Sequence, residues 1–171
     1  MVSMGLGILG DLNTCFKRKF RWLIYIPEVS TAGTGITSNL LPPLKSIRPT
    51  VTFREIEAQH INETIYFPGK PDWKPLTVTL YDIATYINPV WNWIKKIYNP
   101  PIGKYNYPLD NAFIKDRISL YMYDGCGNII EIWNYEDCWI QSADFQDVDM
   151  NDNGIMSIDL TIRYSRAYLV E

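Results

Sequence analysis

The sequence of 171 residues contains one histidine, His60, and only three cysteines, none of them in a CxxC pair. A histidine-based metal cluster is therefore excluded, and a catalytic triad would have to use His60, which falls between two expected strands. The cysteines Cys15, Cys126 and Cys138 indicate free thiols rather than a disulfide framework or a zinc site. Neither a nucleophile elbow nor a Gly-rich phosphate loop occurs. We therefore expect that the chain is not an enzyme and needs no cofactor.

The sequence also lacks an excess of basic residues and a long apolar run. Its net charge is -3 and its pI is near 5.2, which argues against a protein that grips nucleic acid through the phosphates. No apolar run approaches the roughly 20 residues that span a bilayer, so no membrane partner is expected. The N-terminal MVSMGLGILGDLNTCF has no Lys or Arg before its apolar part, and Asp11 interrupts that part. We expect a soluble chain that is made in the cytoplasm without a functional secretion signal.

The composition that remains is that of one globular domain over residues 1–171, with 47% apolar and 14% aromatic residues. Six tryptophans and twelve tyrosines are the unusual feature. Aromatic platforms can stack nucleic-acid bases, but such platforms normally come with a basic groove. Tryptophan and tyrosine are also enriched at protein–protein contacts. The composition therefore favours assembly.

Alternating apolar and polar residues predict antiparallel strands along most of the chain. In the first strand, residues 19–26, Phe20, Trp22, Ile24 and Ile26 share one face. Residues 51–59 and 61–68 predict a strand pair that turns near residues 59–60, followed by a turn in PGKPDW, residues 68–73. Further strands are expected at residues 75–83, 117–123, 129–133 and 138–148, and the last at 154–164.

One helix is expected, beginning after Asn88 as N-cap with Pro89 at its first position and ending before Pro100. Its apolar stripe would consist of Val90, Trp93, Ile94 and Ile97 and would cover a sheet. We therefore expect a mainly β fold with one α-helix, in which two antiparallel sheets pack as a β-sandwich or a partly closed barrel.

The segment DMNDNGIMSIDL has the spacing of a calcium loop, with Asp149, Asn151 and Asn153 as possible oxygen ligands. A calcium loop needs a carboxylate at its twelfth position, which is Leu160 here, and helices on both sides, where this sequence predicts strands. We interpret the segment as a hairpin turn that could bind a cation weakly, not as a calcium loop.

The nearby carboxylates Asp144, Asp147, Asp149 and Asp152 could in principle form an acid pair. We interpret them as the solvated face of a strand that runs into its turn.

Four segments together resemble the tube protein of contractile bacteriophage tails, a family related in fold to the tubes of type VI secretion and extracellular contractile injection systems. They are KFRWLIYIP at residues 19–27, INETIYFPGKPDWKPLTVTLYD at 61–82, VWNWIKKIY at 90–98, and residues 127–167. The last segment is the most specific, because a hairpin, a tryptophan-bearing strand, an acidic turn and a closing TIRY strand follow one another as in the family.

The resemblance implies a structural virion protein whose hexameric rings stack into the inner tube of a contractile tail. The implied partners are further copies of the chain, the sheath protein, the tape-measure protein, and the baseplate hub and tail terminator proteins. DNA would pass through the lumen without specific binding, and the protein would reside in the virion tail after assembly in the host cytoplasm.

The resemblance also implies assembly elements. The long segment 27–50 would be a ring-stacking loop, with Leu40, Leu41, Leu44 and Ile47 as candidate contacts, and Phe20 and Trp22 of the first strand would be further candidates. Residues 1–18 would be an N-terminal extension.

Several alternatives stay open. The chain could be a baseplate-proximal tube initiator or the tube of a phage-derived injection system. From a different class, a monomeric β-sandwich that binds a carbohydrate or a peptide would use the same exposed aromatics. A hydrolase that uses the carboxylates between Asp144 and Asp152 is the least favoured reading.

Overall fold

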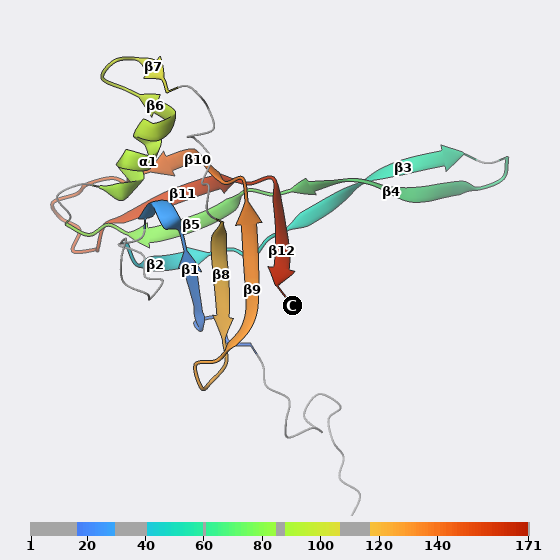
Figure 1. Ribbon diagram of the computed structural model, residues 1–171, viewed down its shortest axis with the longest axis horizontal. Coiled ribbons are helices and arrows are strands. Elements are labelled where there is room, and N and C mark those ends of the chain that lie inside the picture. Colours follow the sequence, from blue (N-terminus) through green and yellow to red (C-terminus); the bar gives the residue numbers. More distant parts are fainter. Residues whose placement is uncertain (1–16, 30–40, 60, 85–87, 107–116, 171) are drawn as a thin grey trace, which may run out of the picture.

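A computed structural model describes residues 17–29, 41–59, 61–84, 88–106 and 117–170. The body of the molecule is built on two four-stranded antiparallel sheets, whose strands cross at a steep angle in Figure 1. The first sheet has the order β1-β8-β9-β12 and the second has the order β10-β11-β5-β2. The first comprises β1 (Trp22–Tyr25), β8 (Ile118–Tyr123), β9 (Ile129–Glu136) and β12 (Arg166–Val170). The second comprises β10 (Trp139–Asp144), β11 (Ser157–Arg163), β5 (Leu76–Tyr81) and β2 (Pro43–Ser46).

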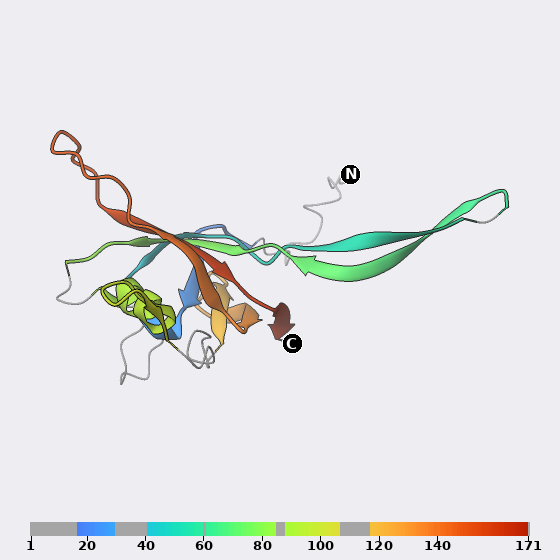
Figure 2. The ribbon, with the colours of Figure 1, turned by 90° about the horizontal axis from the view of Figure 1, so that it is seen from above.

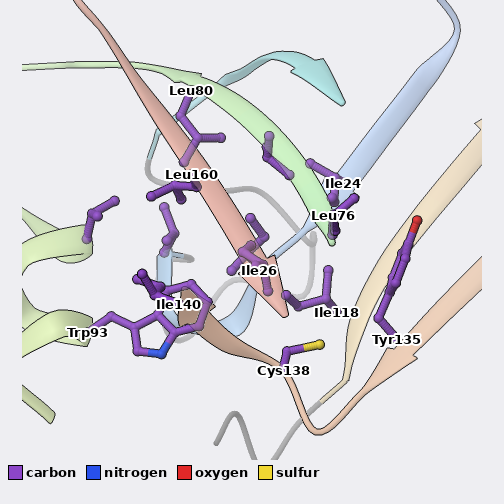
Figure 3. Close-up of a cluster of buried hydrophobic side chains, with 14 of the residues drawn as sticks. Ile24, Ile26, Leu76, Leu80, Trp93, Ile118, Tyr135, Cys138, Ile140 and Leu160 are labelled. Carbon is purple, nitrogen blue, oxygen red and sulfur yellow. The ribbon is translucent and has the colours of Figure 1, made fainter. Parts of the chain in front are cut away.

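The apolar residues that alternate along these strands form one core between the sheets. In β5 the side chains of Leu76, Val78 and Leu80 are buried, as their period of two predicts. They belong to one buried cluster with Ile24 of β1 and other residues of both sheets. Figure 3 shows Leu76 and Leu80 of β5 in this cluster together with Ile24. The predicted class is therefore confirmed: the fold is mainly β, with packed antiparallel sheets and one α-helix, and the described strands do not close into a barrel.

The helix α1 (Pro89–Ile97) is the predicted one. The Asn88 Oδ1 accepts hydrogen bonds from the backbone N–H of Val90 at 3.0 Å and of Trp91 at 3.2 Å, so it caps two of the amides that a helix start leaves unpaired. Val90 and Trp93 are buried in the core, and Ile94 and Ile97 pack partly against it. Among the described residues, no helix has the length and apolar character that a membrane crossing requires.

A long two-stranded arm projects from the second sheet (Figure 1). It consists of β3 (Val51–Gln59) and β4 (Thr64–Trp73), which pair antiparallel and follow β2 and precede β5 in the chain. The expected strand pair is thus present, but the expected turn at PGKPDW is wrong, because these residues continue β4 as far as Trp73. Its prolines are tolerated because a two-stranded arm leaves an outer edge of each strand without a ladder partner.

The register of the pair shifts between Phe53 and Glu55, where β4 bulges and places Gly69 and Lys70 opposite the single residue Arg54. A Cβ on Gly69 would lie 2.6 Å from the backbone oxygen of Arg54, so the two strands can approach here only if this residue has no side chain.

Other boundaries differ from expectation. β1 begins at Trp22, so Phe20 lies before the strand. The segment 27–50 contains a 3-10 turn, η1 (Pro27–Val29), and the edge strand β2, and is not a plain loop. β10 ends at Asp144 rather than at residue 148, and β12 follows the strand that was expected to be the last. The proline-rich segment after α1 forms a small hairpin of β6 (Tyr98–Asn99) and β7 (Lys104–Tyr105).

Candidate assembly surface

The outer half of the β3–β4 arm has one apolar face. Ile56 pairs with Phe67 and Ala58 pairs with Ile65, so these four side chains lie on the same side of the hairpin. The neighbouring pair, Glu57 with Tyr66, lies on the opposite side. In the isolated chain Ile56 is 55% exposed, Phe67 is 50% exposed and Ile65 is 46% exposed. The arm thus presents an apolar face that nothing in the described part of the chain covers.

A hairpin with an exposed apolar face is stabilised when another surface covers it. A lone two-stranded hairpin is marginally stable in water, and its unpaired edges invite pairing with another chain. Monomeric soluble proteins rarely expose contiguous apolar patches unless the patch has a binding role. The apolar face of the arm is therefore the candidate surface for a contact with another protein.

The base of the arm is fixed to the core. Trp73, the last residue of β4, packs partly against the core, and its ring lies 6.0 Å from that of Tyr164. The backbone N–H of Lys74 donates a hydrogen bond to the carbonyl oxygen of Thr50 at 3.0 Å, which closes the ladder next to the body. A force on the arm is therefore carried directly to the sheet that holds β5.

The predicted stacking residues lie in different environments. Leu40 is outside the described residues. Leu41 is fully buried in the core, so its side chain is occupied within the monomer. Leu44 is exposed on β2, and Ile47 packs partly against the core while its backbone N–H bonds to Thr77. The stacking role of this segment stays a prediction, with Leu44 as its exposed candidate.

The two candidates from the first strand also differ. Phe20 is exposed, with the Arg21 guanidinium 5.4 Å from its ring centroid, whereas Trp22 is half-buried at the edge of the first sheet. Sequence reasoning missed the arm itself as a surface. Residues 51–59 and 61–68 were expected to form a strand pair, but no surface role was predicted for it.

A buried carboxylate ties the N-terminal part of the described chain to the first sheet. Glu131 of β9 forms ion pairs with Lys17 and Arg48 and accepts a hydrogen bond from the Trp133 indole N–H. Burial alone would raise the pKa of Glu131, but the hydrogen bonds from Lys17 and Trp133 and the charge of Arg48 outweigh burial, and the pKa is lowered. Glu131 is therefore ionised at neutral pH and holds two basic side chains beside the sheet.

The calcium-like segment lies in the connection between β10 and β11, residues 145–156, which we name the acidic loop. The Asp149 Oδ1 accepts from the Asn151 N–H at 2.9 Å, and the Asp152 Oδ1 accepts from the Gly154 N–H at 2.8 Å. These carboxylates thus stabilise backbone turns in a connection between antiparallel neighbours. No set of three or more His, Cys, Asp or Glu side chains among the described residues is arranged to hold a metal ion.

Solved structures share this fold. No protein-family model matches the sequence, and no curated protein matches it. The chain is similar to one in the anti-feeding prophage cap, the tube terminating cap, with a TM-score of 0.70, 15% identity, and coverage of 94% of this chain and 95% of that one. It is also similar to a chain in the sheath/tube terminator of the extracellular contractile injection system PVC, with a TM-score of 0.66, 13% identity, and coverage of 90% and 96%.

A chain in the sheath-tube complex of the same system matches over 99% of both chains, with a TM-score of 0.60 and 14% identity. The fold is therefore that of tube-type proteins of contractile injection systems, as the sequence resemblance implies. Identities this low establish the fold alone.

Proposed function

We propose that this chain is a structural subunit that assembles with its own copies into rings of the inner tube of a contractile tail or injection machine. The observation that carries the proposal is the projecting arm, whose apolar face is left uncovered by the described residues although its base is fixed to the core. A neighbouring copy that receives this face would remove both the exposed apolar area and the open strand edges.

The finer assignment follows the resemblance. Six copies would close a ring, and rings would stack inside a sheath into a conduit that first encloses a tape-measure protein and later passes DNA. The net charge of -3 is compatible with passage, because a basic lining would hold the phosphates. The role would be mechanical rather than catalytic, with rigidity supplied by strand pairing and apolar contacts between subunits.

A second candidate within the same class is the terminal ring that ends the tube. It is favoured by the TM-score of 0.70 with a tube terminating cap, against 0.60 for a chain of the sheath-tube complex. The two candidates differ in what happens after one ring has formed: a tube subunit adds further rings, whereas a terminal subunit stops.

Negative-stain electron microscopy over a concentration series tests the proposal. Rings with a central hole are expected, and their extension into tubes at high concentration would support the tube-body role, whereas a population that stays at single rings would support the terminal role. A chain that stays monomeric at every concentration and salt condition would count against both roles and would favour a monomeric ligand-binding β-sandwich.

A further inference from the structure

The charges of this chain are separated along its sequence. Between residues 17 and 54 the only acidic residue is Glu28, and the rest of the charge is basic. Between residues 118 and 162 there is no lysine or arginine at all. The small net charge of the whole chain therefore hides two regions of opposite sign, and the fold brings each region to a distinct surface feature.

The basic region lines a groove of about 540 Å³ between β1 and β2, which we name the basic groove. Its lining includes the cations Lys17, Arg18, Lys19, Lys45 and Arg48. Glu131 pairs with Lys17 and Arg48, but within the described residues no carboxylate pairs with Arg18, Lys19 or Lys45. Trp22, Leu44 and Met122 add apolar surface to the same groove. A ligand that fits must combine negative charge with apolar side chains.

The acidic loop has that combination. Asp147, Asp149 and Asp152 are all exposed, and between them stand Val148, which is 81% exposed, and Met150, which is fully exposed. The base of the loop is held to the body by Phe145, whose ring stacks edge-on against Trp91 at 6.4 Å. Figure 2 shows the loop standing off from the body at the end opposite to the arm.

We propose that the acidic loop of one copy docks in the basic groove of a neighbouring copy. The loop does not fill the groove of its own chain, because the groove lining contains no residue of the loop. Carboxylates would meet the unpaired lysines and Arg18, while the exposed valine and methionine would cover the apolar surface beside Trp22. This contact deepens the proposed self-assembly, on which it rests, by naming a second pair of matching surfaces.

Two features favour a second copy over a nucleic acid as the occupant. The groove lining has four apolar side chains beside its five cations, whereas phosphate binding relies on the cations alone. In addition, the loop leaves two apolar side chains uncovered at its tip, and the groove supplies the apolar surface that they need. A loop-to-groove contact is heterologous, so it can close a ring or propagate along an axis.

The experiment exchanges one charge across the contact. Lys45→Glu reverses a charge in the groove, and Asp147→Lys reverses one in the loop; Asp147 is chosen because it caps no turn within the described residues. Lys104→Glu, on exposed β7 away from both features, is the matched control for the change in net charge. Sedimentation velocity measures the concentration at which each full-length variant assembles, and thermal unfolding verifies that each is folded.

The expected result is that each single reversal raises the assembly concentration by about tenfold or more, because like charges are placed together. The doubly exchanged variant, with both reversals in one chain, should return to within about threefold of the wild type, and Lys104→Glu should not differ from it. The double variant has the net charge of the wild type, but the two single variants change that charge in opposite directions, so weakened assembly in both, with no effect of Lys104→Glu, separates a direct contact from a general charge effect.

The outcomes separate the two proposals. A wild-type chain that assembles while both reversal variants assemble equally well overturns the loop-to-groove contact and leaves the arm proposal standing. If the charge reversals weaken assembly but removal of the apolar arm face does not, the loop-to-groove contact stands and the arm proposal is overturned. If Lys45→Glu instead abolishes binding of a single-stranded DNA oligonucleotide and the double variant fails to restore assembly, the groove is a nucleic-acid site and the proposal is wrong.

Discussion

Removing the apolar face of the arm should prevent assembly without unfolding the chain. The variant Ile56→Ala/Phe67→Ala truncates the cross-strand pair at the centre of that face. The two residues are 55% and 50% exposed in the monomer, and each presents about 100 Å² of surface, since large apolar side chains offer on the order of 200 Å² when free. Their burial against a neighbour would therefore remove about 200 Å² from water.

Truncation of both side chains to alanine removes about two thirds of that buried area. At about 25 cal/mol per Å² the loss is roughly 3 kcal/mol for each arm that docks. Because every 1.4 kcal/mol is about a factor of ten, the association constant of each contact should fall by about 150-fold. The concentration at which rings appear in sedimentation velocity should rise by at least about that factor, since every subunit of a ring makes the contact.

The monomer itself should be little affected. Neither side chain belongs to the core, and the cross-strand pair contributes about 0.2–1 kcal/mol to the arm alone, so the melting temperature should stay within a few degrees of the wild type. The matched control is Glu55→Ala/Glu57→Ala on the opposite face of the same hairpin, which should assemble like the wild type. A folded Ile56→Ala/Phe67→Ala variant that forms rings at the wild-type concentration would refute the reasoning.

Three further predictions follow from single side chains. Gly69→Ala places a Cβ 2.6 Å from the backbone oxygen of Arg54, so it should distort the arm and reduce assembly while the melting temperature of the body is kept, as electron microscopy and calorimetry can verify. Tyr135→Phe removes a buried hydroxyl that has no hydrogen-bond partner among the residues that the structure describes, so urea unfolding should show unchanged or increased stability, by up to about 1 kcal/mol, whereas a loss of more than that would reveal a partner. Because the folded-state pKa of Glu131 is lowered, its ionised form stabilises the fold above the ordinary glutamate pKa, and this stabilisation is lost as the pH falls through the lowered value. Glu131→Gln should therefore reduce the free energy of unfolding by about 1 kcal/mol at pH 7, a small figure because the two paired cations are half-exposed. The difference in melting temperature between this variant and the wild type should shrink in acid.

The sequence predicted the body of the fold because burial there has a simple period. Residues 76–80 alternate between apolar and polar side chains, and the strand expected there is confirmed. The expected helix cap at Asn88 and the expected packing of the helix are confirmed as well. The errors lie where proline and glycine were read as turns. PGKPDW continues a strand, and Pro43 begins another, because edge strands and two-stranded arms do not need every backbone N–H for the ladder.

The last strand was missed for a different reason. Arg166–Val170 is short and is separated from the end of β11 at Arg163 by only two residues, so its alternation is too brief to separate from the strand before it. Its partner is β9, about 30 residues earlier, and no local pattern specifies that pairing.

The sequence alone could not identify the apolar face of the arm as a surface. Residues 76–80 of β5 and residues 56–67 of the arm both contain apolar side chains on one face, and a period of two records only that the face is to be buried. In β5 the covering surface is the rest of the same chain, whereas the apolar face of the arm stays uncovered by the described residues. The difference is set by the strands on either side: β5 has β11 and β2 as neighbours in a packed sheet, while β3 and β4 pair only with each other among the described strands. The same period of two therefore lies in the core in β5 and on an exposed face in the arm, and only the number of neighbouring strands, a property of the folded chain, separates the two.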